Sequence, residues 1–555
     1  MKYKVLLMVV LFAAAMPLFS QIAPDSYYIQ FSDKAGSIYS IDQPDEFLSQ
    51  RAIERRQHQG IAIVENDIPV NQNYIDGVEA TGATLLYATK WLNGLTITTT
   101  DQSVLDAILA LPYVVEIKGF VEEPLKQQIK EKVFFKNEVI SDEQSLNSAA
   151  LKGTSEFNYG NAFTQINQLN GITLHDQGFR GQGMVIGILD GGFQEADTHI
   201  AFDSLRNDGQ ILGTKDFVHP GGNVYTESYH GTMVLSTIGA NVPGQMIGTA
   251  PKASFWLLRS EYVNTENLIE EYNWVSAAEF ADSVGVDVIN SSLGYIDFDM
   301  PVWDHTYPDM DGNTAVCTIG ADLAASKGIL VVNSAGNSGD NWDFPYVGSP
   351  ADGNEVFSIG AVDGNGIRAS FSSIGPTFDG RIKPDVMAMG SGTAIASYGN
   401  SFSYGSGTSF SSPVTAGMST CLWQANPLVP NMDIKYAIMQ SGSYMENPDN
   451  YYGYGIPDFQ LARAVLTNLI EARSSEKLAL VNPNPITDAT NFSLLKDTNF
   501  SVKIFDNLGK SVYEVDGDKS IENEVESELN TLKSGFYILH IQVSELEQSI
   551  KIIKL

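Results

Sequence analysis

Cysteine is scarce in this sequence. Only two cysteines, Cys317 and Cys421, occur among 555 residues. Both fall within predicted helices, where a buried free thiol behaves as a small hydrophobic group. We therefore predict two free cysteines and no metal site built from them, although an oxidising compartment would permit a disulfide.

Basic residues are also few. The chain has 33 lysines and arginines against 66 acidic residues, a formal net charge of −33. A surface of this sign attracts neither nucleic acid nor anionic membranes, so both are excluded as partners. The hydrophobic content of 43% is that of a globular protein, and the length predicts two to four domains.

Long apolar runs are absent except at the start. A basic stretch, residues 1–4, precedes an apolar run over residues 5–19, and polarity resumes after Ser20. This pattern predicts a secretory signal peptide over residues 1–20, cleaved after Ser20. The alternative, a membrane anchor, is disfavoured because a span usually needs ~18 or more apolar residues. No later segment is long enough to span a membrane.

A serine stands where a glycine-rich loop meets a small-residue, apolar segment. The glycine-rich run covers residues 404–407, Ser409 follows it, and the small-residue apolar segment continues over residues 411–423. This arrangement predicts a loop that turns sharply into a buried helix, with Ser409 in its first turn. The backbone N–H groups and the positive dipole end of such a helix favour negative charge. A nucleophilic serine needs that environment, because attack on a carbonyl creates an oxyanion. Taken alone, Ser409 is better interpreted as an N-cap, the usual role of a serine before a helix.

Three other polar residues follow predicted buried strands or open helices. Asp190 ends an apolar run, His230 opens a second small-residue helix, and Asn337 lies in a glycine turn after a strand. Each has an ordinary structural interpretation as a turn former or helix-start residue. Each residue alone is a weak signal, but the four together, in the order Asp, His, Asn, Ser along the chain, are a specific one.

Together these segments resemble the subtilisin family of serine peptidases, whose triad runs Asp, His, Ser along the chain. The resemblance covers roughly residues 184–417. It rests on the strand ending in Asp190, on His230-Gly231-Thr232, Ser292-Leu293-Gly294 and Ala335-Gly336-Asn337, and on Gly407-Thr408-Ser409 with Pro413. An insert over residues 295–314 departs from the family pattern at the rim of the cleft.

The resemblance implies a role for each group. Asp190 orients His230, which takes the proton of Ser409 and later hands it to the leaving amine. Ser409 forms an acyl-enzyme, and its backbone N–H and the Asn337 amide form the oxyanion hole. Extended peptides add as a strand to a cleft with an open, apolar primary pocket. The residues implied to bind substrate are Ser292, Leu293, Gly294, Ser334, Ala335 and Gly336.

No cofactor is required for this chemistry. Relatives often carry structural calcium, and the loop containing Asp309, Asp311 and Asn313 places oxygen ligands close together. A plain turn is the alternative interpretation of that loop.

Residues 21–122 are predicted to form a separate module. Strand and helix patterns alternate as β-α-β-β-α-β, an order typical of a ferredoxin-like α+β fold. In subtilisin relatives such a module is an inhibitory propeptide, and a permanent binding domain is the alternative. The polar tract over residues 123–155 is predicted to be a linker that contains the maturation site.

Residues 156–470 alternate apolar strands with helices. Strands buried on both faces have this pattern, so we expect an α/β domain with a mainly parallel sheet and helices on both faces. Its site should lie beyond the carboxyl ends of the strands. The glycine run over residues 178–183 precedes its strand, which excludes a dinucleotide site.

Residues 478–555 show short strands separated by turns, which predicts a small β-sandwich. The segment resembles the sorting domain of Bacteroidetes proteins exported by the type IX (Por) system, through residues 483–485, 505–510, 532–537 and 551–555. That resemblance implies export through the periplasm to the medium or the cell surface, with the type IX machinery as a partner. A carbohydrate-binding sandwich is disfavoured because no tryptophan follows Trp423.

The sequence thus predicts a secreted serine endopeptidase that acts on proteins or peptides and is made with its own propeptide. An esterase of the α/β-hydrolase class would need Gly-x-Ser-x-Gly and a downstream histidine. Here Ser411 occupies the fifth position, and the only later histidine is His540, in the tail. A catalytically inactive adhesin on the same scaffold remains the alternative, although it would have no use for both Asn337 and Ser409.

Overall fold

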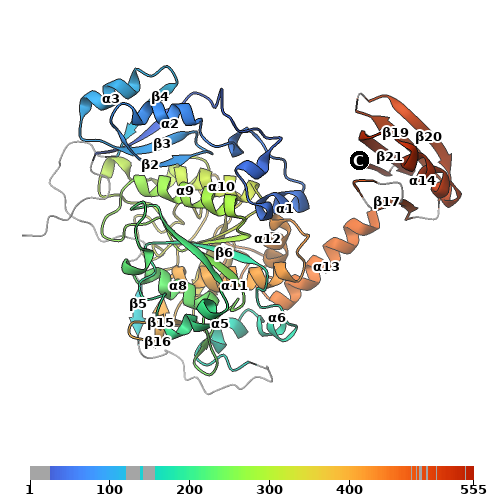
Figure 1. The fold of residues 1–555 in the computed structure, drawn as a ribbon. Coiled ribbons are helices and arrows are strands. Elements are labelled where there is room, and N and C mark those ends of the chain that lie inside the picture. The colour runs from blue at the N-terminus through green and yellow to red at the C-terminus, as the bar shows by residue number, and fades with distance from the viewer. Residues whose placement is uncertain are drawn as a thin grey trace, which may run out of the picture. The chain divides into compact units, whose positions relative to one another are not determined.

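The computed structural model describes residues 25–120, 138–141, 157–476 and, with short gaps, 478–554. The predicted signal peptide and most of the predicted linker lie outside these residues. The chain forms two compact units, Met1–Arg463 and Ala464–Leu555 (Figure 1). Each unit is described by itself.

The amino-terminal module is an antiparallel sheet of order β2-β3-β1-β4, the ferredoxin-like arrangement that the sequence predicts. Helices α2 and α3 share a core with the sheet that includes Ile29, Val78 and Ile108. The prediction omitted α2, a helix of only eight residues that contains Gly77. The elements are β1 (Ser26–Phe31), α1 (Gln50–Gln59), α2 (Gln72–Glu79), β2 (Thr84–Thr89), β3 (Gly94–Thr98), α3 (Gln102–Leu109) and β4 (Val114–Gly119).

A seven-stranded parallel sheet of order β14-β13-β12-β11-β6-β10-β7 forms the centre of the larger unit. Its inner strands are buried along their whole length, which explains their near-continuous apolar sequences. The sequence did not reveal the two edge strands, because β7 is half exposed and β14 is short. The strands are β6 (Val185–Asp190), β7 (Ile211–Asp216), β10 (Ser254–Arg259), β11 (Val288–Ser291), β12 (Leu330–Ser334), β13 (Phe357–Val362) and β14 (Val386–Met389).

Helices cover both faces of this sheet, as predicted. Helices α8 (His230–Gly239) and α11 (Thr408–Gln424) lie on one face, and α9 (Ile269–Val284) and α10 (Val316–Ser326) lie on the other (Figure 1). The remaining elements of the larger unit are β5 (Val139–Ser141), α5 (Phe163–Asn167), α6 (Ile172–Asp176), α7 (Asp203–Asn207), β8 (Asn241–Val242), β9 (Met246–Ile247), β15 (Thr393–Ser397), β16 (Ser401–Ser406) and α12 (Asn431–Gln440), followed by α13 (Phe459–Glu476) across the boundary. Cys317 in α10 and Cys421 in α11 are buried free thiols, which confirms the prediction.

The amino-terminal module rests on α9 and α10. Apolar residues of the module, among them Tyr28 and Phe120, belong to the same buried cluster as Tyr272 and Trp274 of α9. Because this cluster is continuous across the boundary, the module and the sheet domain bury a common core.

A buried group of charges also joins the module to the sheet domain. Asp282 at the end of α9 contacts Arg55 at 2.5 Å, Arg56 at 2.7 Å and Lys90 at 3.3 Å. Burial alone would raise the pKa of Asp282, but the three cations outweigh it and lower the pKa to about 2. The carboxylate therefore stays ionised, and it neutralises cations supplied by the module.

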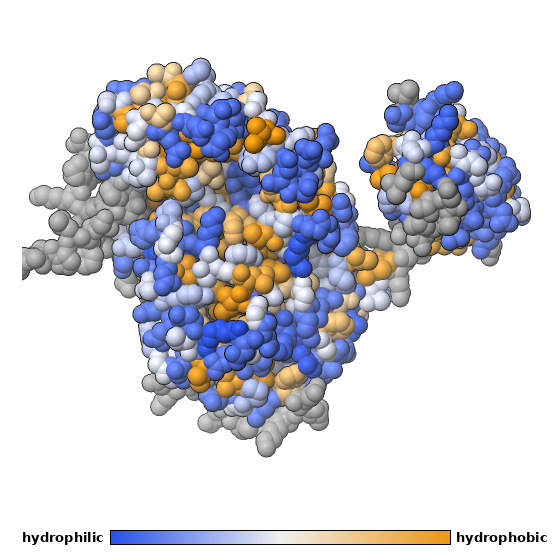
Figure 2. Space-filling view, in the orientation of Figure 1, coloured by the Kyte–Doolittle hydropathy of each residue, from blue (hydrophilic) through white to orange (hydrophobic). Residues whose placement is uncertain are grey.

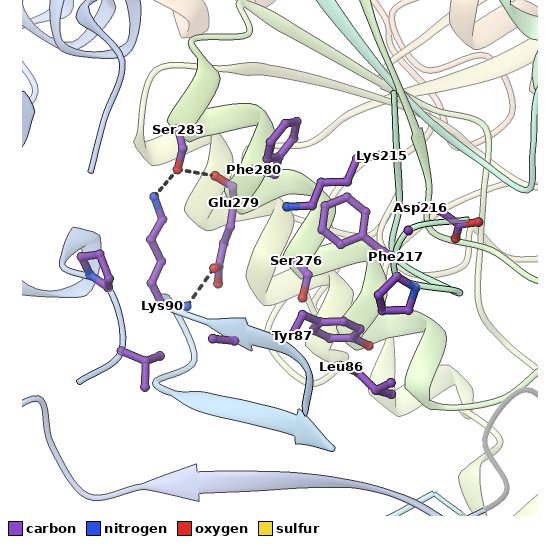
Figure 3. A pocket seen from close by; sticks show the side chains of 15 residues that line it. Leu86, Tyr87, Lys90, Lys215, Asp216, Phe217, Ser276, Glu279, Phe280 and Ser283 are labelled. Carbon is purple, nitrogen blue, oxygen red and sulfur yellow. Dashed lines mark hydrogen bonds between the residues drawn. The ribbon is translucent and has the colours of Figure 1, made fainter. Parts of the chain in front are cut away.

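A cavity of about 460 Å³ lies beside this group, between the module and α9 (Figure 3). Tyr87, Lys215, Phe217 and Phe280 are among its lining residues. On its wall the Glu279 carboxylate accepts hydrogen bonds from the backbone N–H groups of residues 90 and 91, at 2.8 and 2.9 Å. None of the predicted catalytic residues lines the cavity, so it is not the candidate active site.

The carboxy-terminal unit contains a two-stranded sheet, β17-β18, and a four-stranded sheet, β20-β19-β21-β22. Both contribute to one core that includes Phe492, Val502, Leu529 and Ile541. The predicted strands are present, together with a helix, α14, that the sequence analysis missed. The elements are β17 (Ala479–Asn482), β18 (Asn491–Leu494), β19 (Phe500–Asp506), β20 (Ser511–Gly517), α14 (Glu522–Thr531), β21 (Gly535–Val543) and β22 (Leu546–Lys554).

Hydrophilic side chains predominate on the face of the molecule shown in Figure 2, as expected from the many acidic residues. Of the helices that the structure describes, none is both long and apolar enough to cross a membrane.

Candidate active site

Asp190 and His230 meet at the carboxyl edge of the central sheet. Asp190 is the last residue of β6 and His230 the first of α8. Both carboxylate oxygens lie close to His230 Nδ1, at 2.8 and 2.9 Å. Gly231 lets the start of α8 lie close to Gly192, just after β6. Its N–H donates to the Gly192 carbonyl at 3.0 Å, and a Cβ at position 231 would lie 2.4 Å from that oxygen.

The surroundings of His230 favour its charged form. Burial alone would lower the pKa of the imidazole, but the carboxylates of Asp190 and Glu138 outweigh this effect and raise the pKa to about 10. Asp190 is completely buried, and its hydrogen bond keeps a proton on Nδ1 of the His230 ring. Nε2 is left as the nitrogen that exchanges protons with other groups.

Ser409 lies in the first turn of α11, where the sequence placed it. The helix begins at Thr408, and Ser409 is fully buried. Among the residues that the structure describes, the Oγ atom of Ser409 has no hydrogen-bond partner. The serine hydroxyl and His230 are therefore not hydrogen-bonded to each other in this state.

Thr408 orients the side chain of Asn337. The Asn337 Oδ1 atom accepts two hydrogen bonds, one from the Thr408 N–H and one from the Thr408 hydroxyl, both at 2.9 Å. The Thr408 hydroxyl in turn accepts the Gly336 N–H at 3.2 Å. With its oxygen held this way, the amide directs its Nδ2 donor to the opposite side from Thr408.

A second polar network lies beneath the serine. The Ser292 hydroxyl donates to the carbonyl of Ser409 at 3.0 Å and accepts from Asn290 Nδ2 at 3.1 Å. Ser412 closes the network by donating to Asn290 Oδ1 at 3.0 Å. These bonds tie the end of β11 to the first turn of α11.

The six residues predicted to bind substrate follow neighbouring strands, as expected. Ser292, Leu293 and Gly294 come directly after β11. Ser334 ends β12, and Ala335 and Gly336 follow it. All except Gly294 are buried. The fold places these residues beside Asn337 and Ser409. Their contacts with a substrate stay a prediction.

Glu138 was not expected at this site. It precedes the short strand β5, in the part of the predicted linker that the structure describes, and its Oε1 atom lies 3.3 Å from His230 Nε2. Only 9% of its side chain is exposed. Sequence analysis had no signal for this contact, because the pairing partner, β16, lies about 265 residues further along the chain.

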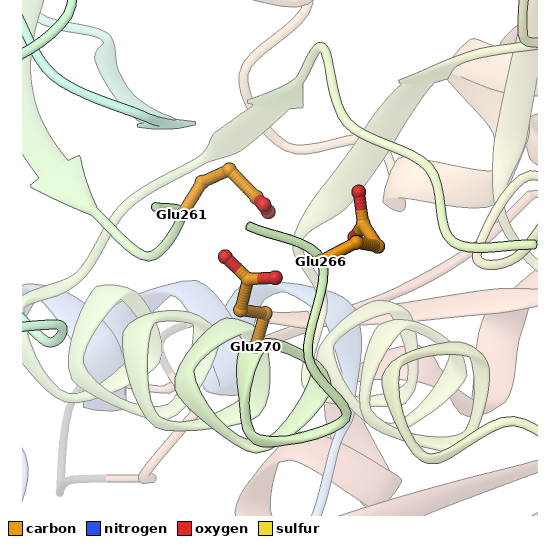
Figure 4. Close-up of side chains that lie close together, drawn as sticks. All are labelled: Glu261, Glu266 and Glu270. Atoms are coloured by element: carbon orange, nitrogen blue, oxygen red, sulfur yellow. The ribbon is translucent and has the colours of Figure 1, made fainter. Parts of the chain in front are cut away.

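Three carboxylates gather elsewhere, near the start of α9 (Figure 4). Oxygen atoms of Glu261, Glu266 and Glu270 lie within 4.8 Å of one another, close enough to share a metal ion. Tyr295, in the predicted insert, donates to Glu261 at 2.8 Å. The loop predicted as a calcium site is separate: Asp309 and Asp311 accept N–H groups of their own turns. Calcium at that loop therefore stays a prediction.

Family comparisons agree with this geometry. Residues 181–455 match the subtilase family model of S8 peptidases, and residues 26–136 match the peptidase S8 propeptide domain of Bacteroidota. Subtilisin NAT of Bacillus subtilis subsp. natto is 31% identical over 300 residues, which cover 54% of this chain and 70% of that protein. This chain belongs to the subtilase family.

Further relatives of this subtilase show a similar extent of matching. Subtilisin of Bacillus pumilus is 30% identical over 54% of this chain and 97% of that protein. Serine protease AprX of Bacillus subtilis (strain 168) is 28% identical, over 53% of this chain and 69% of that protein. Among solved structures, MycP1 with its N-terminal propeptide removed matches at 21% identity with a TM-score of 0.43, over 54% of this chain and 96% of that one.

The tail of the subtilase has its own match. Residues 480–555 match the secretion system C-terminal sorting domain. The chain is thus a subtilisin-like serine peptidase with its propeptide and a type IX sorting domain, and it is exported to the medium or the cell surface.

Proposed function

We propose that this subtilase hydrolyses peptide bonds through Asp190, His230 and Ser409, by way of an acyl-enzyme. The observation that supports this most is the contact of both Asp190 oxygens with His230 Nδ1 in a buried site. The His230 ring lies 6.2 Å from the ring of Phe410, the residue that follows Ser409 in α11. Asp190 holds the imidazole in one tautomer and stabilises its charged form. His230 Nε2 takes the Ser409 proton during attack and returns it to the leaving amine.

The oxyanion formed by that attack needs donors already in position. We assign this role to the Asn337 Nδ2 group and the Ser409 backbone N–H, because Thr408 fixes the Asn337 amide and α11 fixes the backbone. Substrates in this proposal are extended protein segments that lie along Ser292–Gly294 and Ser334–Gly336. A catalytically inactive adhesin would need neither the Asn337 orientation nor the buried carboxylate behind His230.

The experiment is a comparison of Ser409→Ala with Ser419→Ala, each expressed as the full-length chain, in casein zymography. Ser419 lies in the same buried helix, where its hydroxyl donates only to the Thr415 carbonyl, so this variant controls for the loss of a buried hydroxyl. We expect Ser419→Ala to hydrolyse casein and Ser409→Ala to be inactive. Hydrolysis by Ser409→Ala at the rate of the control would refute the proposal.

A further inference from the structure

The linker returns to the active site as a strand. Residues Val139–Ser141 form β5, antiparallel to β16, with Val139 opposite Ser406, Ile140 opposite Gly405 and Ser141 opposite Tyr404. Strand β16 leads directly into α11, so Ser406 lies only three residues before Ser409. Residue numbers along β5 therefore rise with distance from the serine, and Glu138 is the nearest described residue of the linker.

The direction of β5 identifies which half of a substrate it imitates. When a serine attacks a peptide bond, the residues before the bond stay on the serine as an acyl group and the residues after it leave as an amine. Strand β5 starts opposite Ser406, three residues before Ser409, and its carboxyl end points back along β16, away from the start of α11. It has the polarity of a leaving segment, added to the exposed edge of β16.

The side chain of Glu138 lies in the centre of the site. Its Oε1 atom lies 3.3 Å from His230 Nε2. In the proposed mechanism, Nε2 is the atom that hands a proton to the leaving amine. It also lies against Gly407: a Cβ there would be 2.9 Å from Oε1 and 3.0 Å from Cγ of Glu138. Glycine at position 407 thus leaves the space that this carboxylate occupies.

We propose that β5 is the leaving half of the chain's own maturation substrate, and that the Glu138 carboxylate restrains the precursor by capping His230. Cleavage breaks the peptide bond formed by the nitrogen of Glu138. The Ser409 Oγ atom bonds to the carbonyl carbon of that bond, and its proton passes to His230. The C–N bond then breaks, the proton moves to the Glu138 nitrogen, and water later releases the acyl group as a carboxylate. This inference rests on the function proposed above and specifies its first substrate.

The restraint follows from charge. A carboxylate on Nε2, in addition to Asp190 on Nδ1, favours protonation of both ring nitrogens, and together they raise the pKa of His230 well above its ordinary value. A doubly protonated imidazole cannot accept the Ser409 proton. Cleavage then has to wait until the Glu138 carboxylate moves from His230.

The test compares four full-length precursors: wild type, Glu138→Gln, Glu79→Gln and Ser409→Ala. Glu79 is an exposed glutamate of α2, so its variant is the matched control. We expect the mature wild type to begin at Glu138. At neutral pH Glu138→Gln should be cut at the same bond about tenfold faster or more, the change expected for a shift of one pKa unit or more in the base. Glu79→Gln should match wild type, and Ser409→Ala should stay uncut.

A second readout does not depend on cleavage. In the Ser409→Ala background, the pH titration of the His230 ring protons by NMR should move to lower pH when Glu138→Gln is added and stay unchanged with Glu79→Gln. A mature terminus other than Glu138, equal cutting rates, or an unmoved His230 titration would each overturn the inference. If mature wild type hydrolyses casein through Ser409 but begins elsewhere, only this inference fails. If casein hydrolysis does not depend on Ser409, the proposed function fails as well.

Discussion

The guanidinium of Arg56 and the carboxylate of Asp282 form an ion pair of 2.7 Å in which neither side chain is exposed beyond 1%. Arg56 belongs to the amino-terminal module and Asp282 to α9 of the peptidase domain. The cations of the module neutralise the Asp282 charge only while the module is bound to the peptidase domain. The pair therefore helps to hold the propeptide in place.

Removing Asp282 should weaken the precursor strongly. In Asp282→Ala, Arg55 and Arg56 lose a buried partner, and breaking one side of a buried ion pair costs about 3–5 kcal/mol. We expect the free energy of unfolding of a Ser409→Ala precursor to fall by that amount in urea denaturation. Glu446→Ala, at an exposed position, should change it little. A fall no larger than that of the control would mean that the network adds nothing to stability.

The stability of the precursor should also depend on the protonation of Glu279. Burial raises the pKa of this carboxyl to about 7, although the Lys90 charge opposes the shift. Since the folded protein holds the proton that the unfolded chain has released, this contribution is present below about pH 4.5 and is lost as the pH rises to about 7. The loss amounts to about 3 kcal/mol.

Urea denaturation of Ser409→Ala precursors across pH 4 to 8 measures this effect. The difference between the parent protein and Glu279→Gln should change across that window, whereas the difference from Glu446→Gln should stay flat. A flat difference for Glu279→Gln would show that folding does not raise the pKa of this carboxyl.

The sequence was most informative where local pattern and function coincide. Asp190, His230 and Ser409 each stand at the junction of a buried element and a loop, so their positions on those elements could be predicted. Glu138, Thr408 and Asn290 could not be assigned in the same way. Their roles come from contacts between segments far apart in the chain, and no periodicity encodes such contacts.

The fold shows the same division. Strands buried on both faces, such as β6 and β12, were predicted because burial makes them continuously apolar. Edge strand β7 and helix α14 were missed because each buries only part of its surface. The short apolar pattern of such elements is easily interpreted as loop.

Removing the Asn337 side chain should slow turnover without unfolding the enzyme. We expect Asn337→Ala to lose about 100- to 1,000-fold in kcat, the range known for the loss of one such donor in subtilisin, with KM nearly unchanged. Asn341→Ala, at an exposed position in the following turn, is the control. Steady-state kinetics on a peptide substrate decides the matter, and a loss within about threefold would remove Asn337 from the mechanism.

Deleting residues 482–555 should separate activity from export. The carboxy-terminal unit has its own core, so the peptidase unit should fold without it and hydrolyse casein at the normal rate. In its host, the truncated chain should stay in the periplasm while the full chain reaches the medium or the cell surface. Immunoblots of the fractions test this expectation, and equal export of both chains would contradict it.

The central claim is that Ser409 is the nucleophile, and covalent labelling tests it most directly. Mature enzyme treated with a serine-directed phosphonate should lose casein hydrolysis in step with the addition of one phosphonyl group, and peptide mass spectrometry should locate that group on Ser409. His230→Ala should react far more slowly, because nothing then takes the serine proton. A label on another residue, or full activity with Ser409 labelled, would contradict the account.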